Sequence, residues 1–483
     1  MKSINFLNKT KRCIFNFNYY NNFQRNHYCS IRKNSKRNEN KIISLYSWGC
    51  SKDGKLGNND ELVDCEPFPK RIEMIKTNND EIIDNFSLSD IGIKDVECGH
   101  YHTMIIDKND NLYQCGWTSF VGINNLMKNH KNLIATSVIK PSNKNIVGNN
   151  NNINNITDEG DGFKVKSVSG GRRHTLILTK EGRVFSYGIG SEYQLGHGDN
   201  NNRSDPTEIK ELSNKGIIKV VSGWGHSLAL SKFGELYSWG FSNDSQTGHG
   251  FLIDKPIKVP KLISSDFKFK NVFSGSDFVI ALTDKGELVS FGSNEFGQLG
   301  NGTQINQEFP TIIKSGFNYN HDKFNKIIES AAEGGRFDKR ISCGFSHCLI
   351  LNDSGELFTF GWNGNGQLGI GNSSSSSNSS RITNQTIPIK LDSSRLFDGE
   401  KIEMVSAGRN HSVALTQSGR LYVWGNSNHG KLGNGTVSGN QYEPMELFDF
   451  NESVPQSFPL EFQKVLNISS GFDHTIIELL EDK

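Results

Sequence analysis

The sequence contains no run of eighteen apolar residues, and its mean hydropathy is −0.52. A helix that crosses a bilayer needs about twenty predominantly apolar residues, so the sequence excludes such a helix and predicts a soluble protein. It also lacks an HExxH motif, a CxxC pair and any His-Cys cluster with metal-ligand spacing. No serine, cysteine or aspartate is marked by its neighbours as a nucleophile beside a base. We therefore expect no metal site, no cofactor and no covalent catalysis.

Acidic residues are scarce in the first 41 residues, which carry ten Lys and Arg and only one acid, Glu39. This segment has a net charge of +9, which leaves −8 on the rest of a chain whose total is +1. Three interpretations compete: a mitochondrial transit segment, which is basic and poor in acids; a basic arm for nucleic acid; or an Asn-rich tail without a role. We assign 1–41 to this tail and 42–483 to a folded domain.

The rest of the chain consists largely of one repeated unit, best seen at 405–433. Two short apolar runs, 411–416 and 420–424, alternate with period two, as half-buried strands do, around a turn at Gln417-Ser418-Gly419. This pattern predicts a β-hairpin. Five further complete copies lie at 94–122, 167–196, 220–248, 272–300 and 341–369.

The two ends of the chain each hold half a unit. Residues 45–57 have only the second half and residues 468–480 only the first, so together they make a seventh copy. Pairing these ends would close a ring and leave no exposed sheet edge at the junction. We therefore predict an all-β fold, a seven-bladed β-propeller closed by its N- and C-terminal segments.

Insertions lengthen some of the repeats. They fall at 124–163, 303–340 and 372–380, and we expect them to be disordered loops because they have too little apolar content to pack. Within the second of them, 322–332 has apolar residues at helical spacing.

Most repeat positions have packing explanations. The turn glycine, Asn111 in the first full repeat, suits a tight turn with positive φ, and an aromatic-Gly pair ends the next strand. Cys98 and Cys343 fall in a column of small residues, which suggests reduced, buried cysteines. Segments 49–56 and 425–432 imitate a phosphate-binding loop, but they lack its Ser or Thr and occupy the repeat's Gly-Gln-Leu-Gly column.

A histidine recurs in six of the seven repeats, with Phe278 in its place once. Each histidine belongs to a separate unit, so the six cannot converge on one metal ion. We predict a structural role, with each ring hydrogen-bonding a neighbouring backbone. These histidines are His102, His174, His226, His347, His411 and His474.

The pattern V-x-x-G-x-x-H-[ST]-x-x-L-x(4)-G-x-[LV]-[YF]-x-[WF]-G-x(4)-G-[QK]-L-G resembles the regulator of chromosome condensation repeat, which forms seven-bladed propellers. In that family the founding member acts on chromatin as a guanine-nucleotide exchange factor for a Ran-type GTPase. Relatives include mitochondrial exchange or assembly factors, ultraviolet receptors and interaction modules. The receptor function requires a cluster of Gly-Trp-Arg-His motifs, and this chain has one partial match, 223–226.

The resemblance also implies which residues meet a partner. In the family, the two residues between the repeat glycine and the repeat histidine contribute to partner contact, and Tyr, Trp and Arg are frequent anchors of interfaces. Two of the acids, Asp277 and Asp473, resemble those that an exchange factor presents to its GTPase. The predicted partner-binding residues are Tyr101, Arg172, Arg173, Trp224, Asp277, Phe345, Arg409 and Asp473.

These observations lead to a functional hypothesis. We expect a protein-interaction propeller, mitochondrial in location, that acts as an exchange-type regulator or assembly factor for a small or organellar GTPase. The alternatives are a nuclear, chromatin-associated Ran-type exchange factor that contacts nucleic acid through its tail, and a non-catalytic scaffold. The alternative locations are the nucleus and the cytoplasm.

Overall fold

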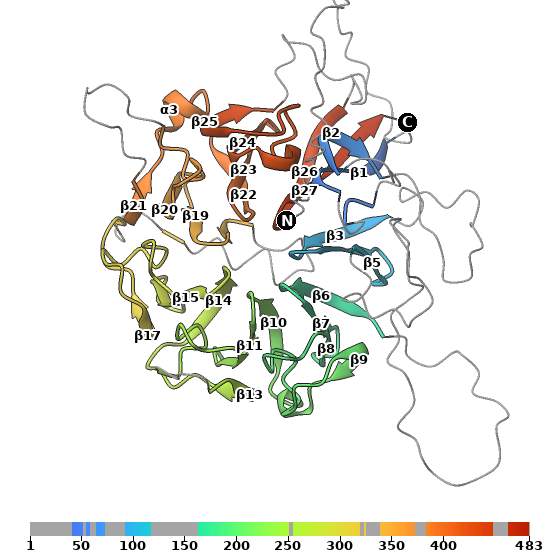
Figure 1. The fold of residues 1–483 in the computed structure, drawn as a ribbon, viewed down its shortest axis with the longest axis vertical. Coiled ribbons are helices and arrows are strands. Elements are labelled where there is room, and N and C mark those ends of the chain that lie inside the picture. Colours follow the sequence, from blue (N-terminus) through green and yellow to red (C-terminus); the bar gives the residue numbers. More distant parts are fainter. Residues whose placement is uncertain are drawn as a thin grey trace, which may run out of the picture. The chain divides into compact units, whose positions relative to one another are not determined.

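The computed structural model describes residues 41–51, 55–57, 64–72, 92–116, 163–250, 255–318, 323–324, 339–371, 383–447 and 462–482. Within the compact unit Asn40–Lys483 these residues form seven sheets, the blades, arranged in a ring (Figure 1). The prediction of a seven-bladed β-propeller is therefore confirmed. The first strand begins at Lys41, one residue before the predicted start of the domain.

The blades are numbered in chain order, each from its innermost strand outward. Blade 1 comprises β3 (Ile93–Cys98), β4 (His102–Asp107) and β5 (Leu112–Gly116). Blade 2 comprises β6 (Val165–Gly170), β7 (His174–Thr179), β8 (Val184–Gly188) and β9 (Arg203–Glu208). Blade 3 comprises β10 (Ile217–Ser222), β11 (His226–Ser231), β12 (Leu236–Gly240) and β13 (Ile257–Leu262). Blade 4 comprises β14 (Phe269–Ser274), β15 (Phe278–Thr283), β16 (Leu288–Gly292) and β17 (Gln307–Ile312).

The remaining three blades complete the ring. Blade 5 comprises β18 (Ile341–Cys343), β19 (His347–Leu351), β20 (Leu357–Gly361) and β21 (Gln385–Lys390). Blade 6 comprises β22 (Ile402–Ala407), β23 (His411–Thr416), β24 (Leu421–Asn426) and β25 (Asn440–Glu446). Blade 7 comprises β26 (Phe462–Ser470), β27 (His474–Asp482), β1 (Lys41–Cys50) and β2 (Cys65–Arg71). The helical elements among the described residues are short: η3 (Lys210–Leu212), α3 (Ser393–Leu396) and η5 (Asn428–Gly430).

Blade 7 joins the two ends of the chain, as the half-repeats predict. Strand β1 pairs antiparallel with β27 in an unbroken register from Lys41 opposite Asp482 to Gly49 opposite His474. This register contains nine residue pairs, whereas the corresponding strands of blade 3 share five, from His226 to Leu230. Each backbone hydrogen bond contributes about 1 kcal/mol net, so the longer ladder strengthens the closure of the ring.

The outermost strands carry a feature that we did not predict from the sequence. Six of them hold a proline at the corresponding position, beside an irregularity in their pairing with the third strand. Proline has no N–H to donate, so it suits an edge strand and hinders pairing with another chain. These prolines are Pro69, Pro206, Pro260, Pro310, Pro388 and Pro444.

Two predictions about loops and turns need correction. The predicted insertion 303–340 includes β17, the outer strand of blade 4, because these residues pair with β16 and Ile312 packs against the core between blades 3 and 4. In blade 1 the turn residue with positive φ is Asp110, at 65°, and not Asn111, because the register places Asp110 where the other blades have glycine.

The remaining loop predictions cannot be compared with the structure. The predicted insertions 124–163, apart from Phe163, and 372–380 lie outside the described residues. So does most of the predicted helix 322–332.

Apolar clusters between adjacent blades form the core. The tryptophans of the aromatic-Gly pairs, Trp48, Trp239 and Trp424, have no exposed surface, and Trp239 donates to the Gln194 carbonyl of the preceding blade at 2.9 Å. The glycine that follows, Gly240, has φ of 100°, and a Cβ there would lie 2.5 Å from the Gly225 carbonyl oxygen. The aromatic-Gly pair is therefore a packing device between blades. No helix in the described part of the chain is long and apolar enough to cross a membrane.

Candidate protein-binding face

Seven loops, each joining the first strand of a blade to the second, meet at one end of the ring. In each loop two residues separate the repeat glycine from the repeat histidine or Phe278. We call the surface they form the GxxH face: residues 100–101, 172–173, 224–225, 276–277, 345–346, 409–410 and 472–473.

In each loop the repeat glycine makes room for the ring of the repeat histidine or of Phe278. A Cβ on Gly223 would lie 2.1 Å from Cε1 of His226, so only glycine leaves room for the imidazole ring. Burial lowers the pKa of His226 to about 3, and the ring is therefore neutral at neutral pH. This neutral ring can act both as donor and as acceptor of hydrogen bonds.

All six repeat histidines reach a side-chain hydroxyl of the next blade. The Nε2 atom of His174, for example, lies 2.9 Å from Oγ of Ser227. We predicted backbone partners, and the structure shows hydroxyl partners instead because the next blade presents a Ser or Thr at this level. The other pairs are His102 with Thr175, His226 with Ser274, His347 with Ser412, His411 with Thr475 and His474 with Thr103, at 2.9–3.1 Å.

The first residues of four loop pairs form a plug of aromatic rings. The ring centroid of Trp224 lies 5.1 Å from that of His100, 5.4 Å from that of Phe345 and 5.6 Å from that of Phe472. These residues come from blades 3, 1, 5 and 7, so the plug spans the ring. Burial lowers the pKa of His100 to about 4, which keeps this ring uncharged.

Two arginines cover the plug. The guanidinium carbon of Arg172 lies 4.2 Å from the Trp224 ring centroid, and that of Arg409 lies 4.3 Å from the Phe472 centroid. Cation–π contacts of this kind contribute about 0.5–1 kcal/mol at exposed sites. Arg409 is exposed and Arg172 is half-buried. The two guanidinium groups thus lie over an apolar centre, an arrangement that suits an interface anchor.

In three loops the second residue of the pair contacts the Gly-[Gln/Lys] turn of the preceding blade: Asp277, Asp473 and Tyr101. Asp277 accepts a hydrogen bond of 3.0 Å from Nε2 of Gln246, and Asp473 forms an ion pair with Lys431. In the same way, the Lys55 ammonium lies 5.8 Å from the Tyr101 ring centroid.

The two acids of the face have opposite electrostatic environments. Burial, with a further contribution from nearby Asp244, raises the pKa of Asp277 to about 7. Burial also disfavours ionised Asp473, but the charge and the hydrogen bond of Lys431 outweigh it and lower the pKa of Asp473. No ion pair joins Asp277 to a basic side chain among the residues that the structure describes. Asp277 is therefore the acid that a basic partner group could complement.

The structure also brings in residues that we did not predict. Lys55 and Lys431, each 2% exposed, and Gln246 support the predicted residues Tyr101, Asp473 and Asp277. Lys431 occupies a repeat position that is glutamine in most units, and the loop of the next unit carries Asp473. The combination of an unusual lysine with an acid in the following loop could have predicted their ion pair from the sequence. Glu192 is held over Gly225, where a Cβ would lie 2.2 Å from Oε2 of Glu192.

The predicted partner-binding residues all lie on this face, but their side chains differ in what they already contact. Trp224 and Phe345 pack within the plug, and Arg172 and Arg409 cover it. Asp473 is paired, and Tyr101 lies beside Lys55. Arg173 is half-buried and contributes to the electrostatics around Glu192. Their role in partner contact stays a prediction.

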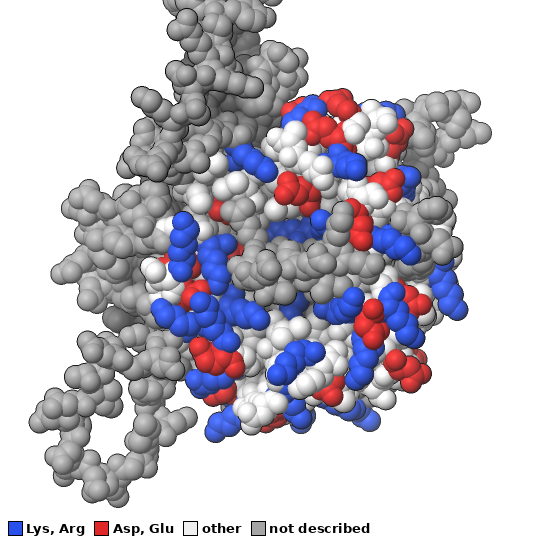
Figure 2. All heavy atoms as spheres, turned by 180° about the vertical axis from the view of Figure 1, so that it is seen from behind, with Lys and Arg blue, Asp and Glu red and all other residues white. Residues whose placement is uncertain are grey.

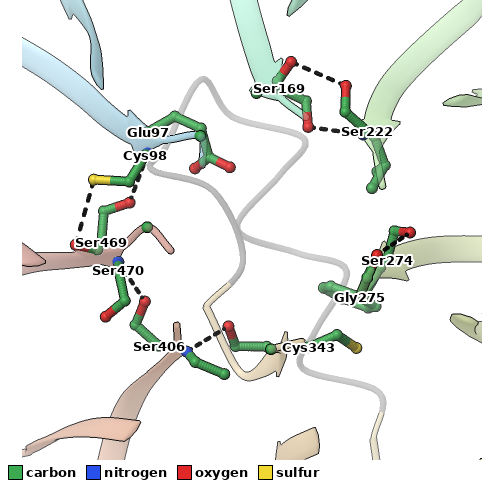
Figure 3. A pocket seen from close by; sticks show the side chains of 18 of the residues that line it. Glu97, Cys98, Ser169, Ser222, Ser274, Gly275, Cys343, Ser406, Ser469 and Ser470 are labelled. Atoms are coloured by element: carbon green, nitrogen blue, oxygen red, sulfur yellow. Dashed lines mark hydrogen bonds between the residues drawn. The ribbon is translucent and has the colours of Figure 1, made fainter. Parts of the chain in front are cut away.

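Inside the ring, the first strands of the blades line a central cavity of about 190 Å³ (Figure 3). Serine hydroxyls join adjacent first strands here: Ser169 accepts from the Ser222 amide at 2.9 Å, and Ser406 accepts from the Ser470 amide at 2.8 Å. In blade 1 the corresponding residue is Glu97, whose pKa burial raises to about 7. Serine hydroxyls at the cavity thus link neighbouring blades.

The opposite end of the ring carries the turns between the second and third strands. Seen from behind the view of Figure 1, Lys and Arg side chains are interspersed with Asp and Glu around the ring (Figure 2). Charge of one sign therefore does not dominate that surface.

Comparison with known proteins agrees with this architecture. The chain is 31% identical over 314 residues to the ultraviolet-B receptor UVR8 of Arabidopsis thaliana, a match that covers 65% of this chain and 62% of UVR8. It thus spans less than two thirds of that relative. It is 26% identical over 457 residues to the mitochondrial RCC1 domain-containing protein RUG3 of Arabidopsis thaliana, covering 90% of this chain and 88% of RUG3.

Among solved structures, Prp20p of Saccharomyces cerevisiae superposes with a TM-score of 0.70 at 19% identity and covers 92% of each chain. This likeness establishes a shared fold. Models of the Regulator of chromosome condensation (RCC1) repeat match residues 44–106, 181–230, 234–282, 285–351, 354–415 and 418–477, which is well over half of the sequence. The chain therefore belongs to the family of proteins built from RCC1 repeats.

Proposed function

We propose that this protein regulates a GTPase by binding it through the GxxH face, as a nucleotide-exchange factor or as an assembly factor. The observation that carries the proposal is Asp277. Its half-buried carboxyl group lies on the face, its pKa is raised to about 7, and the described residues supply no ion pair for it. A Lys or Arg of a partner would restore the ionised form and contribute binding free energy.

Two features beside Asp277 support an interface at this place. Arg172 and Arg409 cover an aromatic plug near the axis, and aromatic and arginine side chains are the commonest energetic anchors of interfaces. Among proteins of this fold, Prp20p binds Gsp1p and histones. An exchange factor needs no covalent chemistry, because it acts by binding the nucleotide-free GTPase more tightly than the nucleotide-bound form.

Affinity capture with the full chain tests this proposal. Whole-cell and mitochondrial lysates would be passed over the immobilised protein with and without EDTA, which strips magnesium and nucleotide from GTPases. We expect a GTPase that is retained more strongly with EDTA. Its release of fluorescent GDP should then be faster in the presence of the propeller. A GTPase retained equally with and without EDTA, and without faster release, would identify an assembly factor.

A matched pair of variants assigns the binding to the face. Asp277→Asn removes the unpaired acid, whereas Asp284→Asn removes an exposed acid from the turn at the other end of β15. We expect at least tenfold weaker capture for Asp277→Asn and unchanged capture for Asp284→Asn. Equal capture by both variants, or the absence of any GTPase from the eluate, would contradict the proposal.

We further propose that residues 1–41 direct the protein to mitochondria. The support is the basic composition of this segment and the similarity to RUG3, a mitochondrial protein, over most of the chain. Fusion of residues 1–41 to a fluorescent reporter should produce a mitochondrial signal. A nuclear signal, together with salt-sensitive binding of the full chain to nucleosomes, would instead favour the chromatin-associated alternative.

A further inference from the structure

Blade 5 places two cysteines opposite each other on adjacent strands. Cys343 ends β18, Cys348 is the second residue of β19, and the register pairs them directly. Their sulfur atoms lie 3.7 Å apart, and both cysteines are free. The Gly344 amide donates to the His347 carbonyl, so the cysteines form the adjacent, non-hydrogen-bonded pair, in which side chains approach most closely.

This geometry is compatible with a disulfide bond. The Cα atoms of a non-hydrogen-bonded pair are about 4.5 Å apart, within the range of about 4.4–6.8 Å found for disulfides. The sulfur atoms need only approach to about 2 Å, which small rotations of the two side chains provide.

The pairing is specific to blade 5. The position of Cys343 holds a small residue in every blade. The position of Cys348 holds a Ser or Thr in blades 1, 2, 3, 6 and 7 and a valine in blade 4. The hydroxyl of that Ser or Thr often meets the histidine of the preceding blade. Here the preceding blade has Phe278 instead of histidine, so no imidazole engages the sulfur of Cys348.

The two cysteines differ in accessibility. Cys343 is half-buried and borders the central cavity, and Figure 3 shows its sulfur turned from the cavity toward the blade. Cys348 is fully buried, and burial raises its pKa well above the usual value. A cavity of about 190 Å³ admits a molecule such as hydrogen peroxide, since a water molecule occupies about 30 Å³. Cys343 is therefore the more accessible of the two cysteines.

We propose that Cys343 and Cys348 are a redox-sensitive thiol pair that hydrogen peroxide converts to a disulfide. The Cys343 sulfur attacks one peroxide oxygen and the O–O bond breaks. The departing hydroxide takes up the thiol proton and is released as water, and Cys343 becomes a sulfenic acid. The Cys348 sulfur then attacks the Cys343 sulfur, the S–O bond breaks, and the Cys348 proton leaves with the hydroxide as a second water. Two thiols and one peroxide thus give one disulfide and two waters.

The bond would close the loop of blade 5 covalently at its base. Phe345, within that loop, contacts Trp224 and Phe472 in the plug. Oxidation would therefore fix one of the loops that build the GxxH face. In compartments kept reducing, protein disulfides are typically transient and redox-sensing, and a reversible cross-link suits such a role. The inference does not depend on the identity of the partner.

Thiol mapping on the full chain tests the proposal. The reduced, folded protein would be treated with hydrogen peroxide, unfolded in guanidinium with N-ethylmaleimide, and digested with chymotrypsin. This enzyme cleaves after Phe345, so the peptides that contain Cys343 and Cys348 remain joined only by a disulfide. We expect the joined peptide after oxidation and its loss after treatment with dithiothreitol.

Cys98 provides the matched control. It occupies the same column in blade 1 and borders the same cavity, but its cross-strand neighbour is Thr103. Burial raises the pKa of Cys98 to about 12. We expect N-ethylmaleimide to alkylate Cys98 fully after the peroxide treatment. In Cys348→Ser, dimedone should trap a sulfenic acid at Cys343. Alkylation of Cys343 and Cys348 as complete as that of Cys98, or a link from Cys343 to any other cysteine, would overturn the proposal.

Discussion

Replacing Asp277 by asparagine should stabilise the folded protein at neutral and alkaline pH. The carboxyl group has a pKa of about 7 in the folded state, raised first by burial, against 3.8 for an exposed aspartate. The folded protein therefore binds this proton more tightly than the unfolded chain does. Stability falls as pH rises from about 4 to about 7, and the loss is complete above pH 7.

The size of the effect follows from the two pKa values. Each factor of ten in proton affinity corresponds to about 1.4 kcal/mol, which sets an upper bound of about 4 kcal/mol on the cost of ionised Asp277 at pH 8. Because the side chain is only half-buried and accepts a hydrogen bond from Gln246, we expect about 1–3 kcal/mol. Asparagine carries no charge and keeps an acceptor for Gln246, so it removes most of this cost.

Urea denaturation of the full chain at pH 5 and at pH 8, followed by tryptophan fluorescence, measures the change. The free energy of unfolding of Asp277→Asn should exceed that of the unmutated protein, and the excess should grow by about 1–2 kcal/mol from pH 5 to pH 8. An excess that does not vary with pH, or a variant less stable at pH 8, would refute the assignment of a raised pKa.

Asp473→Asn is the control, because it changes the same position of another loop, where the pKa of the acid is lowered instead of raised. The lowered pKa of Asp473 means that its ionised form stabilises the protein above about pH 4, and that this stability is lost as pH falls through the lowered value. The substitution leaves buried Lys431 unpaired and should cost about 3 kcal/mol at both pH 5 and pH 8. A stabilised Asp277→Asn variant that loses its partner would show that the native acid is retained for binding at a cost in stability.

Further predictions concern the histidines, the plug and the ring closure. Burial lowers the pKa of His102 to about 4 and the pKa values of His174 and His411 to about 3. The folded protein therefore loses stability as pH falls below about 6.5. Circular dichroism should show steep acid unfolding between about pH 4 and 6, and an unfolding midpoint below pH 3 would contradict this. Phe278→His should destabilise the protein by about 1–3 kcal/mol, and adding Cys348→Thr should recover at least about 1 kcal/mol because the new ring gains a hydroxyl; additive effects in a double-mutant cycle would argue against the contact. Trp224→Ala should cost about 3 kcal/mol in urea denaturation through loss of the plug, and a cost below about 1 kcal/mol would mean that the plug is not packed. Deleting residues 474–483 removes β27 and should abolish cooperative unfolding, whereas a two-state melt of the truncated chain would show that ring closure is dispensable.

Much of the fold could be predicted because each repeat satisfies its own local requirements. Turn residues, period-two strands and aromatic-Gly pairs can be recognised in short segments of sequence. The half-repeats at 45–57 and 468–480 predict that the two end segments pair and close the ring. The turn of blade 1 was misassigned by one residue because asparagine and aspartate both tolerate positive φ, and only the register with Leu112 identifies Asp110. Strand β17 was missed because its apolar residues lie next to a polar insertion.

The candidate site was predicted only as a set of positions. The repeat pattern alone determined that fourteen loop residues, two per blade, lie at one end of a closed ring, because spacing within a repeat fixes the end of the strand at which a residue lies. The tertiary structure decided what those residues do, because charge, burial and stacking depend on side chains from other blades. It brought Trp224 against His100 and Phe472, paired Asp473 with Lys431, and left Asp277 with an amide partner and a raised pKa.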